Sequence, residues 1–420
     1  MKKVASIFIL ILFTLLVFCG CKMKESTKHE GNKYSELESA VIMDLKEKIE
    51  KGDTEALQEF WNNLENKGTP IIEEIEGDSE NALVTFIYKE DYEIDNVVVL
   101  IPPFEVEKKL EKLLDTNLWY KTCKMRNDLR FIYDFSVNDP LDGNFHSKIL
   151  EFDRLNKNKL PAFNGNPYVV MPNAPDNFWT IERDDVPKGK LDEHKYYSEK
   201  LDEQRSIKIY TPNGYSKENK PYGYLVLTDG GAYIEFLSAV TVLDNLIADK
   251  KIPPMVAVFV ETHSRRSIDM TYNDEFSYFL AQELVPWMKN NYNISDNLNE
   301  AIMGGTSLGG LNASYVGLKY PDTFGNVLSQ SGAYYIKPTE TDEDNWLAEQ
   351  FNSKDKLPMK IYLDIGILES KEMIDSNLYF RDTLIGKGYS VHLEEFKSGH
   401  DYLSWGETLA KGLIWLIGTE

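Results

Sequence analysis

The second half of the chain alternates short apolar segments with amphipathic helical patterns, and this alternation constrains the fold more than any other feature. Apolar and β-branched residues dominate six strand candidates, at 205–212, 222–231, 254–261, 299–305, 359–366 and 390–396. Helical patterns lie between most of them, for example over 275–292 and 376–388. Repetition of strand, helix and strand favours a largely parallel sheet covered on both faces. We therefore predict an α/β fold over residues 186–420.

The first half of the chain has a different sequence pattern, which predicts a separate, smaller domain. Residues 38–67 have the pattern of two helices, which Gly52 and Gly68 would end. Four short segments rich in β-branched and aromatic residues follow, at 82–89, 96–102, 118–125 and 130–137. Such segments, separated by polar turns, are typical of an antiparallel β-sandwich of roughly immunoglobulin type. We place this domain at 38–160 and a linker at 161–185.

The N-terminus has the layout of a secretion signal. A short basic region is followed by an apolar region at 4–21, which is too short and ends too abruptly for a membrane span. A small residue precedes Cys21, which resembles the bacterial lipoprotein signal, whose cysteine becomes the lipidated first residue. We expect a signal peptide at 1–21, a flexible tether at 22–37, and anchoring to the outer face of the cell membrane. The alternatives are an ordinary signal peptide and an uncleaved anchor.

Charge and cysteine content exclude other classes of protein. The formal net charge is −22, which argues against a nucleic-acid partner because such proteins need basic surface. It also argues against attachment to anionic lipid by charge alone. Cys19 would leave with the signal and Cys21 would carry lipid, so only Cys123 would remain. A single thiol cannot form an internal disulfide, and we expect it to be a core residue.

One short motif indicates the kind of reaction that the protein catalyses. Residues 305–309 read Gly-Thr-Ser-Leu-Gly, which fits the pattern G-x-S-x-G between a strand candidate and a helical pattern. The glycines permit a sharp turn that exposes the hydroxyl of Ser307, and the helix that follows points its first N–H groups at the reacting centre. The alternative is a glycine-rich turn with a buried serine. A strand candidate before Ser307 and a helical pattern after it favour a nucleophilic role for this serine. We expect the reaction of such a serine to need no metal and no cofactor.

A nucleophilic serine needs a base and an acid, which follow it in the chain in enzymes of this kind. His392 and His400 are the only histidines after Ser307. His392 falls inside an alternating strand, whereas His400 falls in a loop beyond it, where a parallel sheet presents catalytic groups. We expect His400 to be the base. The acid should leave the loop after the strand 359–366, and we favour Glu369 over three other carboxylates there: Asp364, Glu372 and Asp375.

An oxyanion formed at this serine needs two backbone donors. The N–H of Leu308, directly after the nucleophile, is the first. The second should come from the loop after an earlier strand, where Gly230 and Gly231 allow close backbone approach. We choose the N–H of Gly231. An ordinary tight turn at these glycines is the alternative.

These segments together resemble the esterase D branch of the α/β hydrolases, and most closely its enterochelin (ferric enterobactin) esterases. The resemblance runs over roughly 56–410 and includes that family's N-terminal β domain. Residues 153–156, Asp-Arg-Leu-Asn, resemble its usual Asp-Pro-Leu-Asn, with Arg154 in place of proline. It implies an α/β-hydrolase domain preceded by a β-sandwich, and the triad Ser307, His400 and Glu369.

The resemblance also implies a substrate. Members of the family cleave the ester bonds of a cyclic tri-catecholate siderophore, with or without bound iron. Arg265 or Arg266 falls where the family keeps an arginine near the substrate, which would suit an anionic catecholate; surface arginines on a loop are the alternative. Two other functions stay open. One is an exported carbohydrate esterase acting on feruloyl or acetyl groups, and the other is a siderophore-binding lipoprotein without activity.

Overall fold

The computed structural model describes residues 38–102, 108–142, 150–160 and 165–419. These residues form two compact units. The first draws on 38–100, 108–127, 133–142, 150–160 and 165–168, and the second on 101–102, 128–132 and 169–419. The predicted signal peptide, Cys21 and the predicted tether lie outside the described residues. Within the described part, no helix has the length and apolar character that crossing a membrane requires.

The first unit begins with two helices, α1 (Ala40–Glu50) and α2 (Ala56–Lys67). The Ser39 side chain caps α1 by accepting a hydrogen bond from the Ile42 N–H at 3.2 Å. Gly68, with φ at 91°, ends α2, as its position in the sequence predicted. Each helix buries one apolar face against the strands that follow. The buried helix residues are Ile42, Leu45, Ala56, Phe60, Trp61 and Leu64.

Two four-stranded antiparallel sheets complete the first unit. One has the order β1 (Ile71–Ile75), β2 (Asp78–Lys89), β6 (Leu118–Arg126), β5 (Glu111–Lys112), and the other β4 (Lys108–Lys109), β3 (Val97–Leu100), β8 (Asp134–Val137), β9 (Leu150–Glu151). Aromatic rings join the sheets: Phe86 meets Tyr133 and Tyr88 meets Phe135, with ring centroids 5.0 and 5.4 Å apart. The sheets therefore pack face to face, and the unit is a β-sandwich, as predicted.

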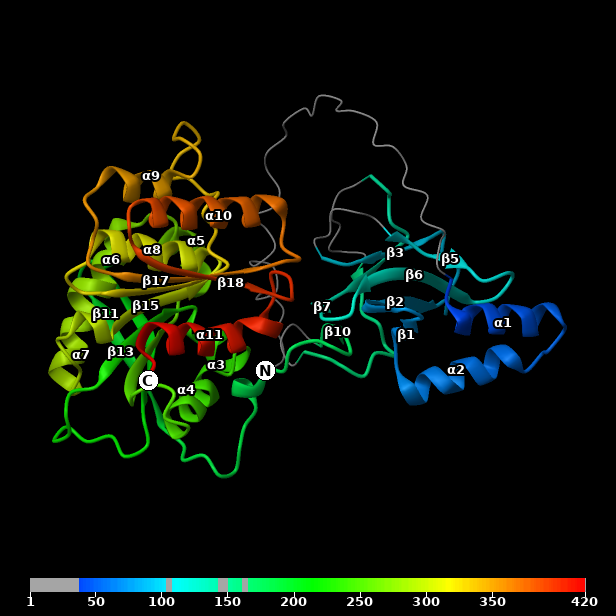
Figure 1. The fold of residues 1–420 in the computed structure, drawn as a ribbon, viewed down its shortest axis with the longest axis horizontal. Coiled ribbons are helices and arrows are strands. Elements are labelled where there is room, and N and C mark those ends of the chain that lie inside the picture. Colours follow the sequence, from blue (N-terminus) through cyan, green and yellow to red (C-terminus); the bar gives the residue numbers. More distant parts are fainter. Residues whose placement is uncertain (1–37, 103–107, 143–149, 161–164, 420) are drawn as a thin grey trace. The chain divides into compact units, whose positions relative to one another are not determined.

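An eight-stranded sheet forms the centre of the second unit (Figure 1). From β14 to β18 every neighbouring pair is parallel, while β11 and β12 add antiparallel pairs at one edge. The order is β11 (Lys190–Ser198), β12 (Glu203–Thr211), β14 (Met255–Val260), β13 (Gly223–Thr228), β15 (Ala301–Thr306), β16 (Asn326–Gln330), β17 (Lys360–Gly366), β18 (Ser390–Phe396). Short β7 (Arg130–Ile132) and β10 (Tyr168–Val170) pair separately.

Helices cover both faces of this sheet (Figure 1). One face packs against α5 (Arg266–Met270), α6 (Asp274–Tyr278), α7 (Val285–Asn291), α8 (Leu308–Lys319), α9 (Trp346–Ser353) and α10 (Lys371–Gly386). The other packs against α3 (Gly230–Glu235), α4 (Ala239–Ala248) and α11 (Tyr402–Ile417). Along β13, Val226 faces the first core while Leu225 and Leu227 face the second, as a buried strand requires. The predicted α/β hydrolase fold is confirmed.

The structure also contains elements that the sequence patterns did not predict. Strands β11 and β16 were absent from the six candidates. Strand β11 is an edge strand with mixed burial, and β16 is a buried strand of five residues, Asn326–Gln330, three of which are polar. Within 130–137 the predicted single strand is divided, because Tyr133 separates β7 from β8. The predicted helix over 275–292 contains a π-helical stretch, Phe279–Leu284, between α6 and α7.

Candidate active site

Ser307 lies at the sharp turn between β15 and α8. Its backbone has φ 57° and ψ −117°, a strained conformation that persists only where the surrounding structure holds it. Glycine makes the turn possible, because a Cβ on Gly305 would lie 2.4 Å from backbone atoms of Gly309. The sequence pattern predicted this turn, and the structure places the Ser307 side chain at the carboxyl edge of the parallel strands.

His400 connects Ser307 to Glu369. Its Nε2 lies 3.0 Å from the Ser307 Oγ, and its Nδ1 lies 2.8 Å from the Glu369 Oε2. A carboxylate only accepts hydrogen bonds, so the neutral imidazole carries its proton on Nδ1 and leaves Nε2 as the acceptor for the serine hydroxyl. The side chain of His400 is 37% exposed and that of Glu369 is fully buried. The arrangement can take the serine proton while a buried anion stabilises the resulting imidazolium.

Glu369 is held on its other oxygen as well. Its Oε1 accepts hydrogen bonds from the Ser331 hydroxyl at 2.5 Å and from the Gly366 N–H at 2.9 Å. Trp405 donates its indole N–H to the same Ser331 oxygen at 3.0 Å. Sequence reasoning missed Ser331, because it lies beyond β16, a strand that the patterns did not predict.

The other carboxylates near the end of β17 have different surroundings. Glu372 and Asp375 lie in α10, and Asp375 pairs with the exposed Lys371. Asp364 is fully buried, and its Oδ1 accepts from the Ser331 N–H at 2.9 Å. Burial raises the pKa of Asp364 to about 8. Of the four carboxylates considered from the sequence, Glu369 is the one that the structure brings to His400.

A further carboxyl follows His400 directly. Asp401 caps α11 by accepting from the Leu403 N–H at 3.0 Å and also receives the Ser398 hydroxyl at 3.1 Å. Burial raises the pKa of Asp401 to about 7, and the nearby His400 opposes that shift. His400 thus lies on a segment that the cap of α11 holds in place.

The backbone N–H groups of Leu308 and Gly231 donate no hydrogen bond within their own helices. Leu308 is the first residue of α8 and Gly231 the second of α3, and the first N–H groups of a helix have no acceptor inside it. The two helices begin at the same edge, because β13 and β15 are parallel neighbours with Leu227 opposite Gly304. Both amides are therefore placed to donate to an anion at that edge.

Arg266 makes internal contacts. Its Nε lies 2.6 Å from the Asp229 Oδ2, and its Nη2 donates to the Thr306 carbonyl at 3.4 Å. Its side chain is 13% exposed. Arg266 therefore links the loop after β13 to the residue that precedes Ser307.

Arg265 is more open, at 44% exposed, and its Nε lies 3.5 Å from one oxygen of Glu203 and one of Asp269. Asp269 is buried, and the Arg205 Nη1 lies 2.7 Å from its other oxygen. Burial raises the pKa of Asp269 although Arg205 opposes the shift. Both predicted substrate-binding arginines thus pair with carboxylates of the protein itself, and binding of substrate by either stays a prediction.

Two further residues from the sequence analysis differ in outcome: His392 lies in its predicted strand, whereas Cys123, predicted to be a core residue, is only partly buried. His392 is within β18, stacked between Tyr362 and Trp415, with ring centroids 5.4 and 5.7 Å away. Cys123 lies in β6, half-buried, and burial raises the pKa of its thiol. Its thiol therefore has the character of a packed side chain rather than of a nucleophile.

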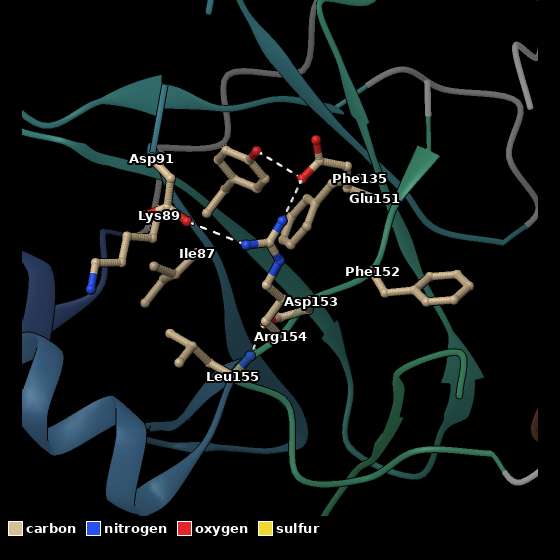
Figure 2. Close-up of a pocket in the computed structure, with 10 residues that line it drawn as sticks. Ile87, Lys89, Asp91, Phe135, Glu151, Phe152, Asp153, Arg154 and Leu155 are labelled. Atoms are coloured by element: carbon tan, nitrogen blue, oxygen red, sulfur yellow. Dashed lines mark hydrogen bonds and ion pairs between the residues drawn. The ribbon is translucent and has the colours of Figure 1, made fainter. Parts of the chain in front are cut away.

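The first unit has a pocket of about 180 Å³ at the Asp-Arg-Leu-Asn motif (Figure 2). Arg154 lies between two carboxylates there, with Nη1 3.4 Å from Asp91 and Nη2 3.8 Å from Glu151. Asp153 accepts the Tyr133 hydroxyl at 2.6 Å. The buried aspartate of the motif thus contacts Tyr133, whereas the arginine pairs with two other carboxylates.

Comparison with known proteins identifies relatives of both units. The model of a family described as putative esterase matches residues 198–416. The iron(III) enterobactin esterase of Escherichia coli O6:H1 is 30% identical over 59% of this chain and 62% of its own length. The crystal structure of the enterobactin esterase from Shigella flexneri in the presence of enterobactin superposes with a TM-score of 0.70. That match has 25% identity and covers 83% of this chain and 95% of the other.

A relative of another kind is also similar. The endo-1,4-beta-xylanase/feruloyl esterase of Xylanibacter ruminicola is 26% identical over 68% of this chain and 40% of its own length.

Proposed function

Because the chain belongs to the putative esterase family and, within it, to the enterochelin esterases, we propose that it hydrolyses the ester bonds of a catecholate trilactone siderophore of the enterobactin or bacillibactin type. The observation that carries the proposal is the continuous hydrogen-bonded chain from the Ser307 Oγ through His400 to Glu369. Such a chain suits nucleophilic attack on an ester carbonyl.

Acylation of Ser307 is the first step of the proposed reaction. The Ser307 Oγ attacks the ester carbonyl carbon while the His400 Nε2 takes the hydroxyl proton. Glu369 stabilises the imidazolium, and the amides of Leu308 and Gly231 donate to the tetrahedral oxyanion. The imidazolium then gives its proton to the leaving alkoxide as the carbon–oxygen bond breaks. An alcohol departs and an acyl-enzyme remains.

Hydrolysis of the acyl-enzyme completes the cycle. The His400 Nε2 removes a proton from a water molecule, whose oxygen attacks the acyl carbon. The same two amides stabilise the second oxyanion, and the proton on His400 returns to the Ser307 oxygen as the acid product leaves. Repeating the cycle at each ester of a trilactone first opens the ring and then separates its monomers.

The test is a hydrolysis panel with enterobactin, bacillibactin, feruloyl-arabinose, acetylated xylan and p-nitrophenyl acetate. We expect the highest kcat/KM on a trilactone siderophore, with or without iron. A phosphonate probe should label Ser307 in the same preparation. An unlabelled Ser307 with no turnover would leave the siderophore-binding lipoprotein as the better account, since a binder needs no reactive nucleophile.

A carbohydrate esterase is the second candidate, because the xylanase/feruloyl esterase from Xylanibacter ruminicola is similar over 68% of this chain. The same catalytic residues serve either substrate, so the geometry around Ser307 does not separate the two. Turnover of feruloyl-arabinose or acetylated xylan with none of either siderophore would decide for this candidate.

We also propose that the protein is exported and held at the outer face of the membrane by lipid on Cys21. The proposal comes from the N-terminal sequence alone. We expect Cys21→Ser to release the protein or leave its precursor unprocessed, because a dual-lipid cysteine would be the anchor of the mature chain. Fractionation and the mass of the N-terminal peptide test this, with Cys123→Ser as the matched control. A cleaved Cys21→Ser protein that still sediments with membranes would contradict the proposal.

A further inference from the structure

The segment after β16 contacts both ends of the catalytic chain. The Ser307 N–H donates to the Gln330 carbonyl at 2.8 Å, and the Ala333 N–H donates to the Ser307 carbonyl at 3.1 Å. Between these two contacts, the Ser331 hydroxyl donates to the Glu369 Oε1 at 2.5 Å. One short segment therefore contacts the backbone of Ser307 and the carboxylate of Glu369.

The orientation of the Ser331 hydroxyl follows from its neighbours. The Trp405 indole is a donor only, and its N–H lies 3.0 Å from the Ser331 Oγ. The Ser331 oxygen therefore accepts from Trp405 and directs its own proton to the Glu369 carboxylate. Ser331 is fully buried, so no solvent competes for this proton.

The backbone of Ser331 is held as firmly as its side chain. Its φ is 48°, in the left-handed region that residues other than glycine seldom adopt. Its N–H lies 3.0 Å from the Asp364 carbonyl and 2.9 Å from the Asp364 Oδ1. These contacts fix the hydroxyl at one position relative to the loop after β17.

We infer that Ser331 is a positioning residue for the acid: its hydroxyl, oriented by Trp405, holds Glu369 so that the Oε2 points at His400. The inference rests on the proposed function, since it gives Ser331 a part in the same hydrolysis. Without the hydroxyl, the Glu369 Oε1 keeps only the Gly366 N–H, and the carboxylate gains freedom to turn from the imidazole.

Three titratable groups face this carboxylate: His400, Asp364 and Asp401. Burial raises the pKa of Asp364 to about 8 and that of Asp401 to about 7. Any pH profile must therefore be compared with that of Asp364→Asn and Asp401→Asn enzymes, so that a shift caused by Ser331 is separated from titration of these two.

The experiment measures kcat, KM and their pH dependence for Ser331→Ala and Ser331→Gly on p-nitrophenyl acetate. Removing a hydrogen bond to a charged group should lower kcat by about 10- to 100-fold. The KM should stay within about two-fold of the wild-type value. The acid limb of the rate profile should move down by about 0.5 to 1 pH unit, because a carboxylate that turns from the imidazole stabilises the imidazolium less. A variant that lost activity only through destabilisation of the fold would keep the acid limb of the wild-type enzyme.

The two variants and one control distinguish the outcomes. Glycine suits a positive φ, so Ser331→Gly removes the hydroxyl without adding strain. Ser277→Ala removes another buried serine hydroxyl, one in α6 that donates to the carbonyl of the cap residue Asn273, and should leave the profile unchanged. Ser331 variants with wild-type kcat and an unmoved acid limb would overturn the inference, as would failure of both to fold. A wild-type protein inert to the ester and the phosphonate would instead overturn the proposed function.

Discussion

Two carboxylates flank the turn that carries Ser307, and they differ in the basic side chain that each one contacts. Glu369 pairs with His400 at 2.8 Å, and Asp229 pairs with Arg266 at 2.6 Å. Each carboxylate follows a parallel strand of the same sheet. His400 reaches the Ser307 Oγ, whereas Arg266 reaches only the carbonyl of the preceding residue.

The difference shows how one geometry serves two purposes. Histidine gains and loses a proton near neutral pH, whereas arginine stays charged. The pair with histidine can therefore move the proton of the nucleophile. The pair with arginine can only hold two loops together. Five predictions test this division, and they are given in decreasing order of the effect we expect.

The largest effect is expected from removing the nucleophile or the base. Ser307→Ala and His400→Ala should each abolish ester hydrolysis, by about 10⁴-fold or more in kcat, because members of a triad act as a unit. The double variant should be little worse than either single one. Steady-state kinetics and circular dichroism check this. Full activity in either single variant, with the protein folded, would contradict the proposed mechanism.

The acid should contribute less than the nucleophile. Glu369→Gln keeps the shape of the side chain and removes its charge, so kcat should fall by about 10²- to 10⁴-fold. The matched changes Glu372→Gln and Asp375→Asn should cost little, because both residues lie in α10. A wild-type rate for Glu369→Gln together with a collapse for either neighbour would reassign the acid.

The second pair should affect stability more than proton transfer. Arg266→Gln leaves Asp229, whose side chain is 12% exposed, without its cation, which should lower the free energy of unfolding by about 1–3 kcal/mol. We expect kcat to fall by about 10-fold with an unchanged acid limb. Denaturant unfolding and the pH profile check this. A displaced acid limb would show that Arg266 acts on proton transfer after all.

Arg265 is the control for Arg266, because it is exposed and its contacts are longer. Arg265→Gln should change the free energy of unfolding by less than about 1 kcal/mol. If the guanidinium binds the anionic siderophore, KM should rise for enterobactin and stay unchanged for p-nitrophenyl acetate. Equal KM values on both substrates would exclude that role.

The smallest effect concerns Asp364, a buried carboxyl beside Glu369 that has no cation partner in the described part of the chain. Its pKa is raised to about 8. The folded protein therefore keeps a proton on Asp364 at pH values where the unfolded chain, whose aspartate has the usual pKa near 4, has already released it. The stability from this group is complete at low pH and is lost as pH rises toward 8. Thermal unfolding at pH 5 and pH 8 should therefore show a smaller decline for Asp364→Asn than for wild type. An equal decline in both would contradict this, and Asp375→Asn is the exposed control.

Much of the fold could be predicted because its signals are local. The six strand candidates coincide with strands of the central sheet, and the two N-terminal helices lie at the predicted residues. The unpredicted strands had weak local signals: the alternation of β11 is irregular, and β16 is short and partly polar. Such strands form because neighbouring strands of the sheet supply their hydrogen bonds and burial, which no pattern within the strand reveals.

The turn at Ser307 and the loop at His400 could be predicted from the residues beside them in the chain, because backbone geometry depends on such neighbours. Three contacts could be seen only in the folded protein: that of Glu369 with His400, that of Arg266 with Asp229, and that of Ser331 with Glu369. Those contacts join the ends of different strands, so they depend on the order of strands in the sheet. Coulombic attraction and hydrogen bonding act between whatever groups that order brings together.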